Sequence, residues 1–370
     1  MLYIHIPFCK QACNYCDFHF ATSYRYLDVL FDSLLKEIRL RRDEIPQNIS
    51  SIYLGGGTPS LLKIEQLNKL FDCIHANFFV ENNAEITLEA NPDDLTKQYL
   101  RELKKTSVNR LSIGIQSFYE SDLKFMNRAH TKTEAELCTM QAAEAGFNNL
   151  SIDLIYSTPG LSNEAWRNNL IKASQLPVNH LSCYSLTVEE NTPLFKQINQ
   201  GKVSAPQEEN AATHFEILQQ LAPELGFEHY EISNLAKPGY QAKHNSDYWS
   251  GKSYLGIGPS AHSFTNRNRR VNIANNNRYI KDLLTGDCQH EDEKIDASTR
   301  YNELILTGFR TLKGISIEEI LSLGYSYLPY FKEKLKNHPN RDSIKLDAST
   351  IRLLPSKWLL ADGIASDFFY

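Results

Sequence analysis

The feature that most constrains the fold is a repeated alternation of short β-rich runs and stretches with helical apolar spacing. The β-rich runs cover residues 2–8, 51–57, 85–91, 110–117, 149–156 and 180–186. Such alternation is typical of α/β proteins in which parallel strands are joined by right-handed crossovers. Six units within the first 200 residues favour a partial, open (β/α)6 TIM-like barrel over a closed eightfold one.

The rhythm changes after residue 200, which predicts three parts. The barrel is expected over residues 1–200 and an α+β extension over residues 201–298, where the Gly- and aromatic-rich stretch 227–264 predicts β-hairpins and loops. Residues 299–370 predict helix, turn, helix and a short β-wing, a small winged-helix-like tail. This tail has no basic recognition face, so we expect a structural or partner-binding module that does not bind DNA.

Composition and charge restrict the partners and the cellular compartment that we expect for this protein. The formal net charge is −5, so no basic footprint for nucleic acid is present. No apolar run reaches the ~20 residues of a membrane helix. The opening "MLYIHIPF" does not have the form of a secretory signal, which predicts a cytoplasmic protein in a reducing compartment. We therefore expect the seven cysteines not to form a disulfide framework.

Three of these cysteines stand close together directly after the first predicted strand, in the pattern C-x3-C-x2-C. They are Cys9, Cys13 and Cys16. Thiolates suit iron–sulfur clusters, zinc and copper, but structural zinc takes four protein ligands, usually as two separated pairs. The pattern favours a three-thiolate [4Fe–4S] site with one iron left for an outside ligand. A zinc site completed by His5 or His19, or three incidental thiols, are the alternatives.

Polar and glycine residues follow the other predicted strands. "GGGTP" (55–59) lets backbone atoms approach a ligand closely, and Glu89, Gln116 and Asp153 fall at or near strand ends. Because the carboxyl ends of parallel strands share one rim, we expect these residues to meet the cysteines there. A polar group that ends an apolar strand is costly without a partner, which favours contact with a ligand; a helix cap or a surface salt bridge is the alternative for each.

The cysteine loop with "GGGTP" one unit later resembles the radical S-adenosylmethionine (SAM) superfamily. There the open iron binds the amino and carboxylate groups of SAM, and an electron cleaves SAM to a 5′-deoxyadenosyl radical. The resemblance implies a radical-SAM barrel with [4Fe–4S] on Cys9, Cys13 and Cys16. It implies SAM contacts from Tyr3, Tyr15, Gly56, Gly57, Thr58, Glu89, Gln116, Arg128 and Asp153. No catalytic residue is assigned.

Further motifs resemble the oxygen-independent coproporphyrinogen III oxidase family over essentially the whole chain. They are "YIHIPFCKQACNYCDF", "YLGGGTPS", "EANPDDL", "RLSIGIQSF", "MNRAHT", "IDLIYSTPG" and "YSLTVEENTP". The decarboxylating branch has a fourth cysteine where this chain has Phe18, and a longer segment before the cluster loop. Both differences match the HemW-type branch, which is regarded as a heme chaperone. Ser157 and Leu161 depart from the Gly-x-Pro-Gly-Gln-like turn of the family.

A second mark of the HemW-type branch is "HNSDYW" (244–249), similar to its H-N-x-x-Y-W motif. The resemblance implies heme binding by His244, Tyr248 and Trp249. Imidazole is a good axial ligand of heme iron, and aromatic rings can cover a porphyrin. A structural histidine with core aromatics is the alternative for this motif, and His262 is a competing ligand.

The function predicted from these features is a cytoplasmic radical-SAM-type chaperone that binds [4Fe–4S], SAM and heme and passes heme to acceptor proteins. Oxidative decarboxylation of coproporphyrinogen III in porphyrin metabolism is the enzymatic alternative, so enzyme activity stays open. A metal-stabilised binding module without SAM chemistry is the other alternative. We expect no nucleic-acid partner and no transmembrane segment. Transient contact with membrane-bound acceptors and dimerisation are compatible with the sequence.

Overall fold

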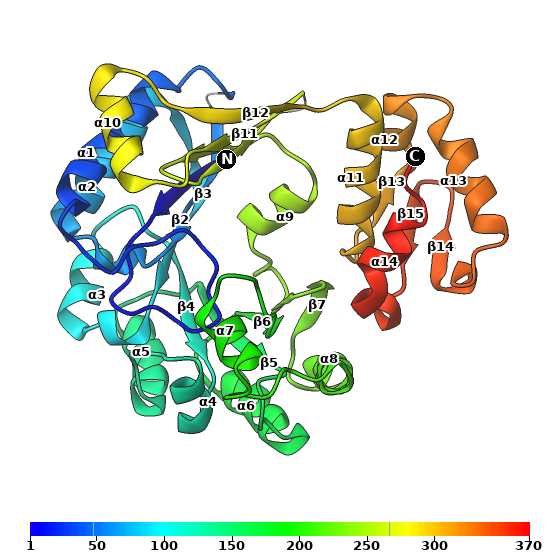
Figure 1. Cartoon of the computed structure of the whole chain (residues 1–370), viewed down its shortest axis with the longest axis horizontal. Coiled ribbons are helices and arrows are strands. Elements are labelled where there is room, and N and C mark those ends of the chain that lie inside the picture. Colours follow the sequence, from blue (N-terminus) through cyan, green and yellow to red (C-terminus); the bar gives the residue numbers. More distant parts are fainter. Residues whose placement is uncertain (47, 266) are drawn as a thin grey trace.

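The computed structural model of the chain describes residues 1–46, 48–265 and 267–370. Its centre is one nine-stranded sheet with the order β7-β8-β6-β5-β4-β3-β2-β1-β9 (Figure 1). Strands β1 to β6 are parallel and follow one another in chain order. Their bounds are β1 Leu2–Ile6, β2 Asn48–Gly56, β3 Phe79–Ala90, β4 Arg110–Gln116, β5 Leu150–Tyr156 and β6 His180–Ser185.

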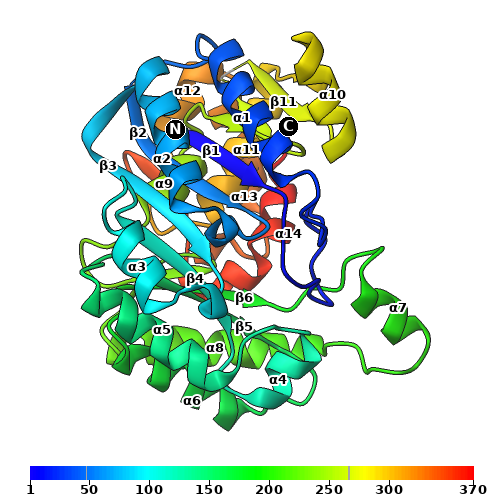
Figure 2. The same ribbon diagram turned by 90° about the vertical axis from the view of Figure 1, so that its left-hand side faces the viewer.

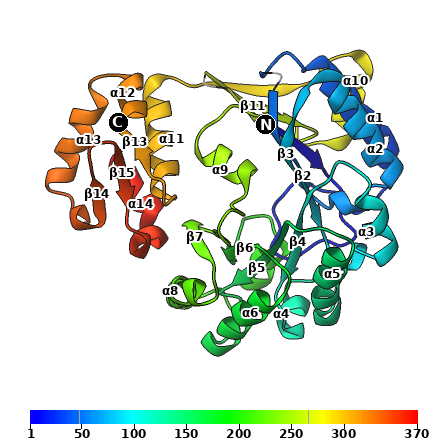
Figure 3. The same ribbon diagram turned by 180° about the vertical axis from the view of Figure 1, so that it is seen from behind.

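Helices connect these strands and cover the outer face of the sheet, as the views from the side and from behind show (Figures 2 and 3). Apolar strands packed under amphipathic helices give the core, in which Ile4, Leu54 and Leu88 are fully buried. The six predicted strand–helix units are therefore confirmed. These helices are α1 Leu27–Leu40, α2 Ile64–Asn77, α3 Lys97–Leu103, α4 Glu120–Phe125, α5 Lys132–Glu144 and α6 Asn163–Gln175, with short 3-10 helices at Pro59–Leu61 and Pro92–Asp94. Helix α7 (Pro193–Asn199) follows β6 and stands apart from this layer (Figure 2).

The segment after residue 200 completes this sheet at both edges. Strands β7 (Glu228–Glu231) and β8 (Asn234–Ala236) form a hairpin that adds antiparallel to β6, and β9 (Leu255–Ile257) adds parallel to β1. The domain boundary at residue 200 stays a prediction, but the sheet itself runs across it. The other elements here are α8 Glu208–Glu224, α10 Asn276–Thr285 and the separate three-stranded sheet of β10 His262–Phe264, β11 Asn268–Asn272 and β12 His290–Lys294.

The prediction of hairpins and loops over residues 227–264 is wrong for the "HNSDYW" segment. Residues Lys243–Trp249 form a helix, α9. The reason is a tertiary contact: the buried Glu85 carboxylate of β3 accepts hydrogen bonds from the Lys243 and His244 backbone N–H groups, both at 3.0 Å. A carboxylate satisfies the free N–H groups of a helix N-terminus and complements its positive end. The sequence of the motif itself contains no pattern that predicts this cap.

The C-terminal residues form a compact unit beside the β7 edge (Figure 1, orange to red). Its order is helix α11 Ala297–Phe309, strand β13 Ile315–Ser316, helices α12 Ile317–Leu323 and α13 Tyr327–Lys336, strands β14 Ile344–Leu346 and β15 Thr350–Leu353, and helix α14 Ala361–Ser366, with 3-10 helices at Arg341–Ser343 and Pro355–Leu360. The three strands form their own antiparallel sheet. The winged-helix-like assignment stays a prediction. Across the described part of the chain, no helix is long and apolar enough to cross a membrane.

Candidate functional site

The cysteine loop leaves the carboxyl end of β1 and is held from two sides. The Cys9 backbone N–H donates to the Ala21 carbonyl (3.1 Å), which closes the base of the loop. On the other side, Asn127 donates from Nδ2 to the Ala12 carbonyl (2.7 Å), and the Asn14 backbone N–H donates to the Met126 carbonyl (3.1 Å). The loop is therefore positioned by the "MNR" turn that follows α4.

Asn127 is a site residue that the sequence analysis missed, although it lies in the quoted motif "MNRAHT". Its backbone has a φ of 56°, in the left-handed region that Asn tolerates better than most residues. Gln11 of the cysteine loop also donates to the Asn127 carbonyl and side-chain oxygen, both at 2.9 Å. An asparagine followed by an arginine after a short acidic helix was the available signal.

The three thiols are half-buried and free of disulfides. Burial raises the pKa of Cys9, and it raises the pKa of Cys16 to about 12. The Cys9 and Cys16 thiols therefore stay protonated at neutral pH without a metal, because burial disfavours the thiolate. A cluster that binds them displaces their protons and supplies the missing positive charge.

The described side chains form no ready-made site for a single zinc ion. In residues 1–46, 48–265 and 267–370, no three Cys, His, Asp or Glu side chains converge as the ligands of one metal ion do. A cluster does not need this, because its three thiolates bind three different irons. His5 is also occupied: its Nδ1 lies 3.1 Å from the Tyr3 hydroxyl and its Nε2 lies 2.9 Å from the His19 carbonyl oxygen. His5 is thus not free to complete a zinc site.

The glycine loop lies against the root of the cysteine loop. The Gly57 N–H donates to the Ile6 carbonyl (2.9 Å), and the Thr58 N–H donates to the Phe8 carbonyl (2.7 Å). A Cβ on Gly57 would stand 2.6 Å from the Phe8 oxygen and 2.7 Å from the Ile6 oxygen. Only glycine allows this approach, so the second strand end is locked to the first.

Two buried carboxyl groups lie at the same end of the barrel. Glu89 accepts hydrogen bonds from the Tyr53 hydroxyl (2.7 Å) and the Gly56 N–H (3.2 Å). Burial raises the pKa of Glu89 to about 7 and also raises the pKa of Asp153. Glu89 lies one residue before the end of β3, and Asp153 lies in the middle of β5. Among the described residues neither Glu89 nor Asp153 has an ion-pair partner within 4 Å; the nearby Arg110 lies 3.9 Å from Glu85 instead.

Arg128 carries a buried positive charge beside the cysteine loop. Its guanidinium donates to Cys13 Sγ (3.3 Å), to the Asn91 side-chain oxygen (2.6 Å) and to the Gly114 carbonyl (2.7 Å). Its Nε is buried with no hydrogen-bond partner in the described residues. A buried guanidinium without a carboxylate is costly, so the site has an unmet demand for negative charge. A cluster-bound thiolate and the carboxylate of SAM both meet that demand.

Other predicted SAM contacts lie around the same rim. Gln116, the last residue of β4, has a φ of 68°, and such strain clusters at ligand sites. The Thr58 hydroxyl accepts from Asn91 Nδ2 (3.1 Å). Tyr15 packs on the apolar group around Leu123. Tyr3 belongs to the rim as well, but it also lines a neighbouring cavity.

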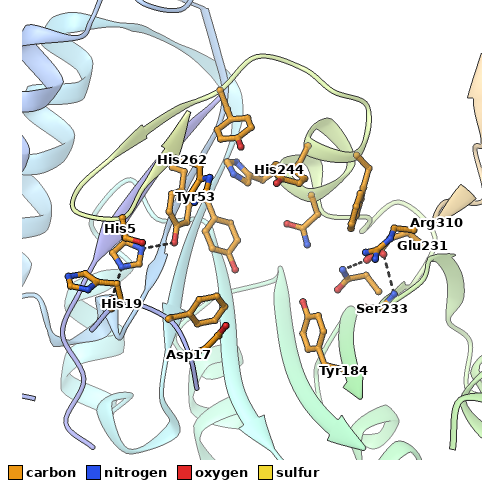
Figure 4. Close-up of a pocket in the computed structure, with 18 residues that line it drawn as sticks. His5, Asp17, His19, Tyr53, Tyr184, Glu231, Ser233, His244, His262 and Arg310 are labelled. Carbon is orange, nitrogen blue, oxygen red and sulfur yellow. Dashed lines mark hydrogen bonds between the residues drawn. The ribbon is translucent and has the colours of Figure 1, made fainter. Parts of the chain in front are cut away.

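That cavity, of about 720 Å³, opens beside the rim and is shown in Figure 4. It brings together parts of the chain that are far apart in sequence: the cysteine loop, the strand ends, α9 and the C-terminal unit. Phe18 lies on its wall and is 66% exposed, which is unusual for a large apolar side chain. The lining includes Asp17, Phe18, His19, Tyr53, Tyr184, Glu231, His244, Tyr248, Trp249, His262 and Arg310. All three predicted heme residues and the competing His262 therefore share one cavity.

His244 is a buried imidazole of this cavity that is held at one nitrogen. Ser51 Oγ lies 2.9 Å from its Nδ1, and the Tyr53 ring packs 5.1 Å away. Burial lowers the pKa of His244 to about 3, so the imidazole is neutral at physiological pH. A neutral imidazole with one nitrogen oriented by a hydrogen bond is the usual state of a metal-ligating histidine. His262, in contrast, is exposed at the cavity mouth.

The departure at Ser157 also has a structural cost. Ser157 has a φ of 62°, which a glycine adopts without strain, and its buried hydroxyl has no partner in the described residues. The Ser157 N–H donates to His214 Nδ1 (3.1 Å), which holds the turn. Leu161 is simply buried in the core.

Comparison with known proteins shows the family to which this chain belongs. The radical SAM superfamily model matches residues 3–170. The chain is 30% identical over 368 residues to "Heme chaperone HemW" of Lactococcus lactis subsp. lactis (strain IL1403), covering 99% of this chain and 96% of that protein. It is 33% identical over 375 residues to the protein of the same name from Bacillus subtilis (strain 168), covering 99% and 98%. The chain belongs to the HemW family of radical SAM proteins.

The predicted resemblance is thereby confirmed, and with it the HemW branch. The fold also matches coproporphyrinogen III oxidase (HemN) from Escherichia coli, with a TM-score of 0.84 at 22% identity over all of this chain and 89% of that one. That likeness concerns the fold alone. Membership of the radical SAM superfamily implies a [4Fe–4S] cluster and SAM, and the buried Arg128 and the closely approached Gly57 suit both groups.

Proposed function

We propose that this HemW-family chain is a heme chaperone that receives heme in the cavity beside the barrel rim and delivers it to acceptor proteins. The observation that carries the proposal is the convergence of His244, Tyr248 and Trp249 with Phe18 of the cysteine loop on one cavity. The name of the curated relatives supports the same function.

The cavity suits a porphyrin in size and chemistry. Its volume lies in the range of cofactor sites, about 300–1,000 Å³. Aromatic side chains on several sides, among them Phe18, Tyr184 and Trp249, offer faces for a flat apolar macrocycle. His244 supplies a neutral nitrogen for the iron. The cavity is also open at its edge, which suits a cargo that must leave again.

The cluster and SAM belong to the neighbouring rim in this proposal. Cys9, Cys13 and Cys16 hold the cluster, Gly56 to Thr58 bring backbone groups close to SAM, and Arg128 neutralises negative charge. Tyr3, Tyr15, Glu89, Gln116 and Asp153 complete the proposed SAM contacts. When bound, the cluster with SAM supplies one-electron chemistry to this family. The chain's own contribution is to hold the two sites side by side, since Tyr3 and Phe18 touch the cavity and the loop region together.

Phe18 is the residue that separates chaperone from decarboxylase in this proposal. It occupies the fourth-cysteine position of the related oxidase and turns an apolar ring toward the cavity. A ring at this place offers contact area to bound heme but no thiol chemistry. The position therefore favours retention of a porphyrin over its modification.

The test uses anaerobically reconstituted full-length protein in two parallel reactions. With coproporphyrinogen III and SAM, we expect no protoporphyrinogen. With heme, we expect a Soret band on the protein and its transfer to an apo heme protein added later. Turnover of coproporphyrinogen without heme transfer would contradict the proposal and favour the decarboxylase.

A further inference from the structure

Arg310 is the only lysine or arginine among the residues that line the described cavity. It lies at the end of α11 in the C-terminal unit. Its backbone is fixed to the barrel side, because its carbonyl accepts a hydrogen bond from the Ile232 N–H (2.9 Å). The guanidinium is therefore brought to the cavity by the joint between the C-terminal unit and the β7–β8 hairpin (Figure 4).

One edge of this guanidinium is already engaged. Arg310 Nε donates to one carboxylate oxygen of Asp362 (2.7 Å), and Nη2 donates to the other. The guanidinium carbon also lies 5.5 Å from the centre of the Trp249 ring, a cation–π contact with the "HNSDYW" helix. No side-chain or backbone acceptor for Nη1 exists in the described residues. A planar guanidinium held at one edge and one face keeps its remaining donors in a fixed direction.

Arg310 and the proposed iron ligand line the same cavity, connected by helix α9. His244 lies in the first turn of α9, and Trp249, whose ring Arg310 contacts, ends the helix. All three residues belong to the cavity lining. Heme carries its two carboxylates at the edge of the macrocycle, away from the iron. A heme whose iron meets His244 therefore presents its carboxylates to another part of the same lining, where Arg310 is the cationic side chain.

Glu231 lines the same cavity as Arg310, and its protonation state affects the charge beside the guanidinium. Its carboxylate accepts hydrogen bonds from the Ser233 N–H (3.1 Å) and from Asn234. Burial raises the pKa of Glu231 to about 7, so part of the population carries it uncharged at neutral pH. Among the described residues, Arg310 forms its ion pair with Asp362 and none with Glu231 within 4 Å, so Glu231 does not occupy the Nη1 edge.

We infer that Arg310 is the carboxylate anchor of this cavity and binds a propionate of heme through its free Nη1 edge. This inference rests on the proposed function, since it takes heme as the cargo. It assigns the C-terminal unit a direct part in cargo recognition. It also makes the cavity selective for porphyrins with free peripheral carboxylates over esterified ones.

The test compares hemin with hemin dimethyl ester in the same detergent solution by Soret titration of the reconstituted full-length protein. We expect the wild type to bind the diacid about 10- to 100-fold more tightly than the ester, the range of one charge-assisted hydrogen-bonded pair. Arg310→Gln should bind both ligands with nearly equal affinity, at the level of the wild type with the ester. Equal affinity of the wild type for both ligands overturns the inference while leaving heme binding, and the proposed function, intact.

Asp362→Asn is the matched control. It breaks the same ion pair as Arg310→Gln but leaves the guanidinium in place, and Asp362 does not line the cavity. We expect this variant to keep or increase the preference for the diacid, because Arg310 loses a competing acceptor. If Asp362→Asn loses the preference as Arg310→Gln does, the effect comes from loosening the C-terminal unit and the anchor is refuted. A wild type that leaves the Soret band of both ligands unchanged refutes the proposed function itself.

Discussion

Replacing Gly57 by alanine tests whether the close packing of the glycine loop on the cysteine-loop root holds the cofactor rim together. The added Cβ would stand 2.6 Å, 2.7 Å and 2.8 Å from three backbone atoms of Ile6 and Phe8, none of which can rotate away. Relief requires the two strand ends to separate, which weakens the hydrogen bonds from the Gly57 and Thr58 N–H groups. Overpacking costs about 1–3 kcal/mol, and each weakened hydrogen bond adds about 0.5–1.5 kcal/mol.

We therefore expect Gly57→Ala to lower the free energy of unfolding by roughly 2–6 kcal/mol and to reduce bound iron, sulfide and SAM affinity together. The assays are chemical denaturation of the apo-protein, iron and sulfide analysis after anaerobic reconstitution, and SAM titration. Gly363→Ala is the control, since its Cβ meets nothing within 4 Å and lies in helix α14, where alanine is favourable. Wild-type stability and SAM affinity in Gly57→Ala would refute the reasoning.

Three further changes follow from single residues. Ser157→Gly should raise the free energy of unfolding by about 1 kcal/mol, because it removes a left-handed strain and an unpaired buried hydroxyl; an unchanged denaturation midpoint contradicts this. The His229 ring packs with its centre 4.9 Å from that of Trp358, and burial lowers the pKa of His229 to about 4. As the pH falls, the unfolded chain binds a proton at this histidine before the folded chain does. The free energy of unfolding therefore falls by about 3 kcal/mol between pH 6.5 and pH 4. His229→Phe should lose this component, seen as a shallower pH dependence of the unfolding midpoint, and a slope equal to that of the wild type counts against it. Cys13→Ser should lose iron and sulfide while keeping its fold by circular dichroism; retained iron rejects the cluster assignment.

The strand–helix rhythm was enough to predict the six parallel strands, because buried parallel strands are continuous apolar runs bounded by turn residues. The gathering of residues such as Glu89 and Gln116 at one rim followed from the same topology. Strand limits differ by one or a few residues, as at β3, where the prediction began at residue 85 and the strand begins at Phe79. Polar residues at the start of that strand hid its true beginning.

Helix α9 could not be predicted from its own letters, because its N-terminus is capped by Glu85 from a distant strand. Asn127 and Arg310 were missed for a similar reason: each acts across a contact between segments more than 75 residues apart or between separate units. The sequence motifs do not show which distant residue each of these side chains or backbone groups contacts. These pairings, such as Asn127 with the cysteine loop and Glu85 with α9, depend on the tertiary structure.

The central claim is that His244 in this cavity binds the iron of heme, and a Soret titration of three proteins tests it most directly. His244→Ala removes the imidazole, whereas Ser51→Ala removes only its hydrogen-bond partner at 2.9 Å and leaves the ligand nitrogen in place. We predict a shifted Soret maximum and at least tenfold weaker binding for His244→Ala, and a spectrum like that of the wild type for Ser51→Ala, with modestly weaker binding. Identical spectra and affinities for His244→Ala and the wild type would contradict the account.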